Sequence, residues 1–427
     1  MRRGTLLLLL ALTLVAAAFR LPGLGYPQAE YFDEVYHAKT ALQYLRGEPP
    51  TEWVHPPTAK LLIALGVALF GYEPWAWRLV PALAGTLLAP VFFLLARQVL
   101  ARERAALLAA VLLLLDGVYL VQSRVAMTNV FAVLFQVLSA LLVLRAARAE
   151  RLGLGTMAAA GLALGLALST RWTSLWAWGF LGLVFLAARA GRLRATLVRE
   201  PGGGAARSWL VVTRELALAL VGFAVLPAAV YLLSYVPWML QGHSVMDAIR
   251  WQRDIWNYHA HLSATHHYFS PWWTWPWLVR PTWYFWWSDA RVVRGIVALG
   301  NPAIWWCAIP AAVWALVSGL VARDWRRLFA GAGFALLYLP WGLSPRTLNF
   351  SHYLFEAIPY ACLALGALLD LGWDGRQRYL ARGYLALAAA LFVLFLPFLL
   401  GLPVPQGLWA YRFPWGVGIW IWFPTWV

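Results

Sequence analysis

The chain has 427 residues, of which 62% are hydrophobic and only 12% are charged. Soluble globular proteins carry about 25% charged residues, so this composition excludes that class. Apolar runs long enough to cross about 30 Å of hydrocarbon recur along the sequence, whereas the short alternating segments of a membrane β-barrel do not. The net charge of +16 could suit nucleic acid, but the arginines cluster between apolar runs, as the positive-inside rule and anionic lipid explain. We therefore expect an all-α polytopic membrane protein that does not bind nucleic acid.

Hydropathy and charge together predict about eleven membrane-spanning helices. In chain order they cover residues 5–19, 75–97, 105–121, 129–145, 156–170, 172–188, 215–237, 296–320, 328–341, 352–371 and 383–401. The first also fits a signal peptide, because a basic start and a leucine run precede Ala16-Ala17-Ala18. Residue 30 lies on the same side of the membrane under either interpretation.

Clusters of arginines give an independent check on this topology. They all fall at one end of the predicted spans, which is the cytoplasmic end by the positive-inside rule. The clusters are Arg2-Arg3, Arg97/Arg102/Arg104, Arg145/Arg148/Arg151, the arginines from Arg189 through Arg214, Arg323/Arg326/Arg327 and Arg376/Arg378/Arg382. All 8 histidines then fall on or near the opposite side. We expect a multi-pass plasma-membrane protein with a cytoplasmic N-terminus.

Two outer loops carry most of the polar chemistry. The first, residues 20–74, holds a short amphipathic helix from 32 to 46 and a second helix after Pro56-Pro57, both suited to the membrane interface. The second, residues 238–295, is rich in Trp, His and Tyr and suits interfacial helices as well. No soluble domain is evident, so residues 1–427 are expected to form one transmembrane domain.

The acidic pair Asp33-Glu34 stands near the start of the first interfacial helix. A carboxylate is costly beside a bilayer, and one retained there is a candidate for function. An ionised carboxylate at this place could act as a general base towards a hydroxyl. The alternative is structural, with Asp33 capping the helix and Glu34 in its first turn. The residues alone favour neither interpretation.

Isolated arginines accompany this pair at the outer ends of the predicted spans. They are Arg20, Arg78, Arg124, Arg171, Arg280 and Arg346. Guanidinium groups stay charged and match phosphate oxygens in a two-pronged geometry, so together they could hold a lipid-linked phosphate. The alternative for each one is a side chain that extends to the lipid headgroups.

Other polar residues within or near the spans have weaker interpretations. Asp116 needs a partner, for which Arg124 is a candidate, and no partner is evident for Glu356. The four histidines in YHAHLSATHHYF (258–269) lack the usual spacing of a zinc site, so we expect contacts with substrate or headgroups instead. Cys307 and Cys362 fall in apolar spans and are expected to be core residues.

Several sequence blocks resemble one known family. FDEVYHAK (32–39) followed by HPPTAKLLIALG (55–66) resembles the signature of the protein O-mannosyltransferases, which have the GT-C glycosyltransferase fold. The similarity continues through WRLVPALAGTL (77–87), LLLDGVYLVQSRVAM (113–127), HHYFSPWWTWPWLVRP (266–281) and PRTLNFSHYLFEAIP (345–359). These blocks occur in the order of the family and span most of the chain.

The resemblance implies an inverting transfer of mannose from a polyprenyl- or dolichyl-phosphate donor to Ser or Thr hydroxyls of translocated proteins. By the family's motif Asp33 would be the base, Glu34 would orient the site, and Arg20 and Arg78 would contact the donor phosphate. We expect Arg124 and Arg346 to join that phosphate site. The residues expected to line the substrate groove are His55, Lys60, Asp116, His267, Arg280 and His352.

The chain departs from the family at two places. Thr128-Asn129 stands where relatives often have Leu-Asp, and the soluble MIR domain of eukaryotic members is absent, which indicates a bacterial or archaeal type. No cofactor is expected, although a divalent metal stays possible. A GT-C transferase with a lipid A or cell-wall polymer acceptor is the main alternative. A transporter is a remote one, because we detect no inverted repeat. The oligomeric state is not predicted.

Overall fold

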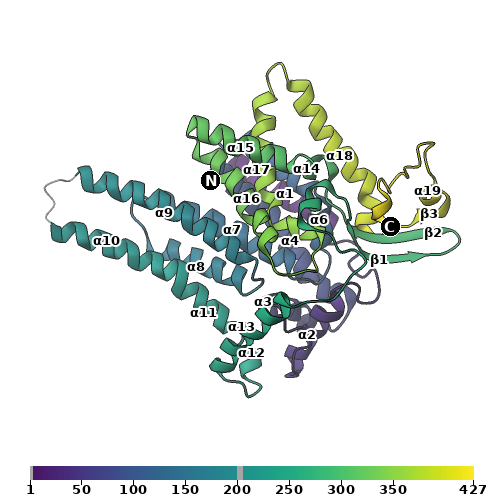
Figure 1. The fold of residues 1–427 in the computed structure, drawn as a ribbon, viewed down its shortest axis with the longest axis horizontal. Coiled ribbons are helices and arrows are strands. Elements are labelled where there is room, and N and C mark those ends of the chain that lie inside the picture. The colour runs from purple at the N-terminus through teal and green to yellow at the C-terminus, as the bar shows by residue number, and fades with distance from the viewer. Residues whose placement is uncertain (1–2, 200–204) are drawn as a thin grey trace.

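The computed structural model describes residues 3–199 and 205–427, and it is built mainly of helices (Figure 1). Within this described part, 7 helical segments are long and apolar enough to cross a membrane. They are α1 (Arg3–Arg20), α4 (Pro74–Val99), α7 (Asn129–Arg148), the Ser174–Arg192 part of α9 (Ser174–Arg199), Trp209–Leu233 in α10 and α11, Pro302–Ala322 in α14 and α15, and α18 (Arg378–Leu400). The predicted helical, multi-span membrane protein is confirmed.

Shorter helices complete the chain. The apolar ones are α3 (Thr58–Phe70), α8 (Leu154–Leu168) and α17 (Ile358–Gly372). The others include α2 (Glu34–Arg46), α5 (Glu103–Leu114), α6 (Gly117–Gln122), α12 (Val236–Met239), α13 (Val245–Ala260), α16 (Trp325–Tyr338) and α19 (Gln406–Ala410). Within the long segments named above, the separate helices are α10 (Ala205–Leu220), α11 (Leu226–Leu233), α14 (Pro302–Trp305) and α15 (Ala308–Ala322). A π-helical turn, Val221–Val225, joins α10 to α11, and 3-10 turns occur at Trp272–Trp277, Leu339–Leu343, Ser351–Glu356 and Pro424–Trp426.

Two predicted spans differ in the structure. The span at 105–121 is broken, since α5 ends at Leu114 and α6 begins at Gly117, with Asp116 capping α6 through the Tyr119 N–H at 2.9 Å. The span at 296–320 begins later, because a β-strand runs to Ala298. Hydropathy missed both features because Asp116 and the strand are surrounded by apolar residues.

A three-stranded antiparallel sheet adds to the helices, in the order β1 (Thr282–Ser288), β2 (Val292–Ala298) and β3 (Val404–Pro405). The β1 sequence TWYFWWS is aromatic and suits a strand. Asp289 then turns the chain, because its carboxylate accepts the N–H groups of Arg291 and Val292 at 2.7 Å. The sequence prediction did not include this sheet.

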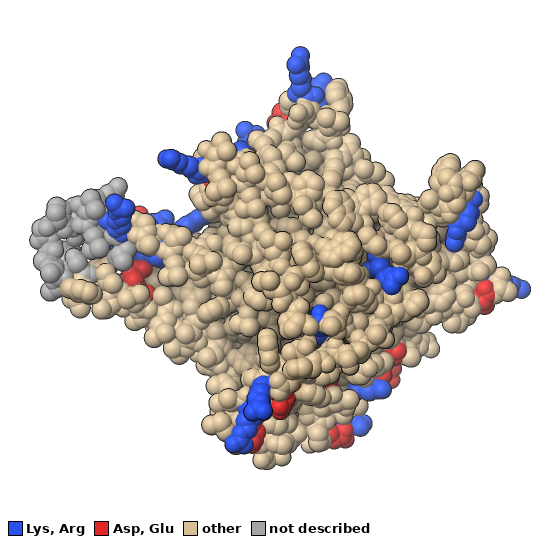
Figure 2. Space-filling model, in the orientation of Figure 1, with Lys and Arg blue, Asp and Glu red and all other residues tan. Residues whose placement is uncertain are grey.

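The core lies around α7, which packs against α4, α8 and α9. Helix α5 lies close to α17, because a Cβ placed on Gly366 would come within 2.7 Å of the Ala109 Cβ. Small residues allow such close helix packing in a membrane. On the face shown in Figure 2, most charged side chains lie towards the edges, and two small basic patches lie nearer the middle of a largely uncharged surface. The helices α2, α3, α12 and α13 gather at one end of the molecule (Figure 1), and the candidate site lies there.

Candidate active site

Asp33 precedes α2 but does not cap it with its side chain. The residue is half-buried, and among the described residues none donates a hydrogen bond to its carboxylate. Burial and the charge of Glu52 raise the pKa of Asp33 to about 6, while the nearby charges of Arg346 and Arg171 oppose that rise. Asp33 therefore presents an unpaired carboxylate that is more basic than usual, which is the property that a general base needs.

Glu34 is fully buried and has a different environment from its neighbour. Arg78 Nε and Nη2 donate to its two carboxylate oxygens at 2.8 and 2.7 Å, and the Ala126 N–H donates to it at 3.0 Å. The remaining N–H groups of Arg78 donate to the carbonyl oxygens of Leu24, Pro27 and Ala29. Glu34 and Arg78 thus fix the loop before Asp33 onto α4.

All five N–H groups of the Arg78 guanidinium are used in these contacts. Arg78 therefore has a positioning role in this structure, and the phosphate contact expected of it stays a prediction.

Arg20 and Arg124 also bond inside the protein. Arg20 is 1% exposed, its Nε donates to Ser123 Oγ at 3.2 Å, and its guanidinium lies 3.8 Å from the centre of the Tyr119 ring. Arg124 Nη1 donates to three carbonyl oxygens at the C-terminal end of α1. Neither side chain lines the cavity described next. Both hold α1 in place, while Arg20 Nη2 is buried with no hydrogen-bond partner among the described residues, and the phosphate contacts expected of these two arginines stay predictions.

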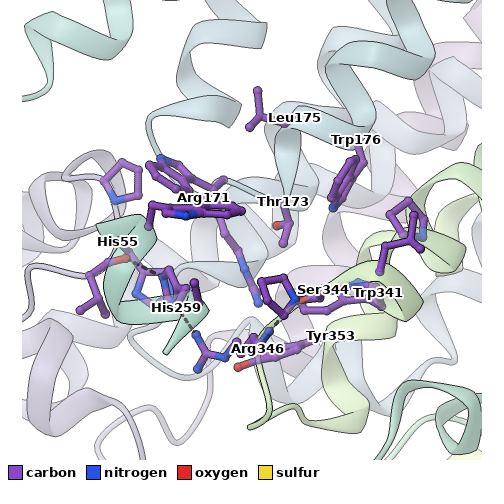
Figure 3. Close-up of a pocket in the computed structure, with 18 residues that line it drawn as sticks. His55, Arg171, Thr173, Leu175, Trp176, His259, Trp341, Ser344, Arg346 and Tyr353 are labelled. Atoms are coloured by element: carbon purple, nitrogen blue, oxygen red, sulfur yellow. Dashed lines mark hydrogen bonds between the residues drawn. The ribbon is translucent and has the colours of Figure 1, made fainter. Parts of the chain in front are cut away.

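A cavity of about 270 Å³ brings together two other outer arginines, Arg171 and Arg346 (Figure 3). Arg346 Nη1 lies 2.5 Å from His259 Nδ1, and its Nε donates to the Leu348 carbonyl at 2.7 Å. The guanidinium of Arg171 lies 4.5 Å from the centre of the Tyr353 ring. Of the four arginines predicted to bind phosphate, Arg346 lines this cavity.

Arg171 is held by two side chains from other helices. Asn129 Oδ1 accepts a hydrogen bond from its Nη1, and a Glu356 oxygen lies 3.6 Å from its Nε. Glu356, for which the sequence offered no partner, also accepts from Gln136 at 2.9 Å and Thr173 at 2.6 Å. Asn129 therefore supplies a neutral acceptor to Arg171.

The rest of the cavity wall is apolar and aromatic. Four tryptophans lie on it, namely Trp172, Trp176, Trp256 and Trp341. A second apolar groove of about 710 Å³ shares Leu175, Trp176 and Pro340 with this cavity and continues along α9. The arrangement places two cations at the end of an apolar groove, which suits a phosphate attached to a long hydrocarbon chain.

Glu52 holds His55, which lines the cavity, and the sequence interpretation missed it. It contacts the Lys60 ammonium, accepts at 2.7 Å from His55 Nδ1, and lies 3.8 Å from His37 Nδ1. Burial alone would raise the pKa of Glu52, but Lys60 and His55 hold it well below its usual range. The sequence did offer a signal for Glu52, because this carboxylate lies in TEWVHPPTAK between the acidic pair and the predicted groove residues His55 and Lys60.

His55 lines the cavity, whereas Lys60 does not. The Lys60 ammonium is buried and also donates to the carbonyl oxygens of Glu52 and His55, at 2.9 and 2.7 Å. Burial lowers the pKa of His55 to about 4 and that of His259 to about 3. Both rings are therefore neutral near pH 7, and His259 donates from Nε2 to the Val54 carbonyl and accepts from Arg346 at Nδ1.

The other four predicted groove residues lie outside this cavity. The Asp116 carboxylate is buried and accepts from Trp305 Nε1 at 2.6 Å, so it joins α6 to α14. His352 is buried and stacks on Phe350, with ring centres 5.5 Å apart. His267 is exposed, and its carbonyl accepts from Arg280 Nη1 at 3.1 Å.

Within residues 3–199 and 205–427, no three His, Cys, Asp or Glu side chains come together in a way that could hold a metal ion. The cluster around Glu52 contains Lys60, whose ammonium occupies the place where a cation would bind. Cys307 and Cys362 are free thiols, and Cys362 is buried.

Comparison with known families decides what kind of protein this is. The profile described as dolichyl-phosphate-mannose-protein mannosyltransferase matches residues 10–77 and 73–241. The chain belongs to this family. A second profile, for the C-terminal four-span region of protein O-mannosyltransferase, matches residues 244–415. The predicted family and enzyme class are confirmed.

Individual relatives agree with this assignment. The chain is 30% identical to a polyprenol-phosphate-mannose–protein mannosyltransferase of Mycolicibacterium smegmatis, over 97% of this chain and 92% of that protein. In fold it is similar to the S. cerevisiae protein O-mannosyltransferase Pmt1-Pmt2 complex bound to the sugar donor, with a TM-score of 0.79, 16% identity and coverage of 94% and 91%. It is also similar to ArnT from Cupriavidus metallidurans bound to undecaprenyl phosphate, with a TM-score of 0.55, 18% identity and coverage of 93% and 71%. The GT-C-like fold is confirmed.

Proposed function

We propose that the protein transfers mannose from a polyprenyl-phosphate carrier to Ser or Thr hydroxyls of proteins, with Asp33 as the general base. Family membership and the names of the relatives support the reaction and its two substrates. The observation that carries the assignment of the base is the unpaired, half-buried Asp33 carboxylate within the electrostatic reach of Arg171 and Arg346.

The proposed step is a single displacement. Asp33 removes the proton from the acceptor hydroxyl, and the hydroxyl oxygen attacks C1 of mannose on the face opposite the phosphate. The bond between C1 and the phosphate oxygen breaks, and its electron pair stays on the polyprenyl phosphate. Arg171 and Arg346 stabilise the negative charge on that leaving group, so no acid is needed. One carboxylate suffices, unlike the carboxylate pairs of glycosidases.

The apolar groove along α9 would hold the hydrocarbon chain of the donor. Its wall includes Trp176, Gly179 and Leu183 from α9 and Leu336 from α16. Leu175, Trp176 and Pro340 line both spaces, so they join the groove to the cavity that contains the arginines. A donor bound there would place its phosphate between the arginines, and a displacement requires its sugar to reach Asp33, whose pKa responds to the charges of both arginines.

We further propose that the chain crosses the plasma membrane eleven times, with interfacial helices α2 and α3 in the outer loop 20–74 and with loop 238–295 at the same interface. The short helices α8, α16 and α17 and the broken pair α5 and α6 would supply the other four crossings beside the 7 long segments. The arginine clusters support a cytoplasmic N-terminus and an active site on the outer side.

The test uses purified Asp33→Asn protein, a radiolabelled polyprenyl-phosphate-mannose donor and an acceptor peptide. Loss of a general base should lower transfer by about 10²- to 10⁴-fold while donor binding is retained. Asp254→Asn is the matched control, since Asp254 is exposed on α13 at the same end of the molecule. Near-normal transfer by Asp33→Asn would refute the proposed base, and label that enters lipid instead of peptide would refute the proposed acceptor.

A further inference from the structure

Phe32, the residue before the proposed base, has a backbone conformation that disfavours a bulky side chain. Its φ is 52°, in the left-handed region that a Cβ atom makes costly. The Glu34 N–H donates to the Tyr31 carbonyl at 3.1 Å, and Asp33 has φ −76° and ψ −3°. A positive φ followed by these angles matches a type II′ turn over residues 31–34, in which glycine is the preferred residue at the place of Phe32. The chain therefore has an aromatic residue where glycine would be relaxed.

The Phe32 ring lies among four other rings. It stacks on Tyr284 of β1, with the ring centres 4.0 Å apart and the planes 14° apart. The rings of His266, Phe350 and His352 lie nearly perpendicular to it, with centres 6.4, 6.2 and 6.1 Å away. Stacked and edge-to-face ring pairs stabilise a structure beyond the area that they bury. These contacts therefore offset the strain of the turn.

Tyr284 is itself held by buried neighbours. Its hydroxyl accepts a hydrogen bond at 2.6 Å from Gln122 Nε2 of α6. Its ring also meets the His352 ring edge to face, with centres 5.5 Å apart. All three of these side chains are buried, so Phe32 stacks on a surface that is fixed inside the protein. The stack joins the turn to β1 and α6, whereas the ion pair described above joins it to α4.

We propose that Phe32 is a positioning residue, whose stack on Tyr284 holds the Asp33 carboxylate in place to meet the acceptor hydroxyl. This role rests on the proposed function of Asp33 as the base. The Asp33 side chain accepts no hydrogen bond from a described residue, so its direction depends on the backbone of the turn. Glycine would suit that backbone but would leave the turn without its contact to β1. A displacement needs a base that is fixed relative to the donor, which gives the ring its purpose.

The test compares kcat and the donor KM of Phe32→Gly with those of the wild type, using radiolabelled polyprenyl-phosphate-mannose and an acceptor peptide. A misplacement of about 1 Å can lower a rate about a hundredfold, so kcat should fall by about 10- to 100-fold while the donor KM stays unchanged. Phe32→Tyr keeps the ring and should keep most of the rate. Phe413→Gly is the matched control, because its ring stacks on Trp415 in the C-terminal segment, and it should keep the wild-type kcat.

A second variant separates the ring from the strain. Phe32→Ala removes the same ring as Phe32→Gly but keeps a Cβ atom in the disfavoured conformation. The glycine variant should therefore have the higher thermal unfolding temperature of the two, whereas both should lose kcat equally. A kcat that follows the stability of the two variants would overturn the proposal.

The pH profile gives a readout that lost packing would not move. Burial, and then the charge of Glu52, raise the pKa of Asp33 to about 6. Arg346 and Arg171 oppose that rise, and burial keeps the Tyr284 hydroxyl neutral by raising its pKa well above the usual range. A carboxylate released from this place becomes more solvated, so its pKa falls. The acidic limb of kcat/KM should therefore move to lower pH when Phe32 is replaced by glycine, and an unmoved limb would overturn the proposal.

A double variant distinguishes failure of the stack from failure of the base. In Asp33→Asn protein, Phe32→Gly should cause no further loss of transfer, because the group that it positions no longer acts. A further loss as large as in the wild type would overturn the positioning role. Wild-type kcat in Phe32→Gly beside an inactive Asp33→Asn would overturn the positioning role alone. Near-normal transfer by Asp33→Asn would refute the base, and with it any residue that positions it.

Discussion

Replacement of Arg346 by glutamine tests which arginines hold the donor phosphate. Two N–H groups of Arg346 are used by Leu348 and His259, and the other three donate to no described residue. A hydrogen bond to a charged group contributes about 1.5–3 kcal/mol, so its loss should weaken donor binding by about 10- to 150-fold. The measurement is the transfer rate against donor concentration at saturating acceptor peptide. Arg280→Gln is the control, because Arg280 lies on the same side but does not line the cavity.

The same variant has an independent pH signature. The positive charge of Arg346 lowers the pKa of Asp33, so its removal should raise that pKa above about 6. Because the base must be ionised to act, the acidic limb of kcat/KM should move to higher pH in Arg346→Gln and not in Arg280→Gln. Unchanged donor dependence together with an unmoved pH profile would refute the proposed role of Arg346.

Three further predictions follow from the same geometry. In the wild type, kcat/KM should fall as pH falls through about 6, because Asp33 becomes protonated, and a flat profile from pH 5 to 8 would contradict this. Arg78→Met should leave the buried Glu34 charge unpaired and cost about 3–5 kcal/mol, seen as a lower thermal unfolding temperature than in Arg280→Met. A selective rise in the donor KM without loss of stability would instead restore Arg78 as a phosphate ligand. Transfer should persist in excess EDTA, and loss that added Mg²⁺ restores would indicate a metal.

Much of the fold follows from the sequence because crossing a bilayer demands long apolar runs. The helices α1, α4, α7, α9 and α18 lie where hydropathy predicts them. Hydropathy is averaged over many residues, and the average conceals a short interruption of a helix. The break at Asp116 was therefore not predicted. The sheet was missed for a related reason, since the tryptophans of β1 are as typical of a membrane interface as of a strand.

The candidate site was predicted less completely, because its arginines look alike in sequence. Each of them ends a predicted span, and only tertiary contacts separate their roles. Arg78 meets Glu34 across 44 residues, and Arg124 meets the end of α1 across about a hundred. No local pattern shows that these two groups are used inside the protein while Arg171 and Arg346 face a cavity.

The acidic pair shows why neighbouring carboxylates can have opposite functions. Successive residues at the start of a helix point about 100° apart, so Asp33 and Glu34 cannot share one environment. Glu34 faces inward, where Arg78 and the Ala126 N–H hold it. This contact fixes the backbone at Asp33, which keeps its own carboxylate free of hydrogen bonds with described residues and near the charges of the cavity. A base must be unpaired to accept a proton and fixed to meet the hydroxyl, and in this chain the second requirement is met by the residue beside it.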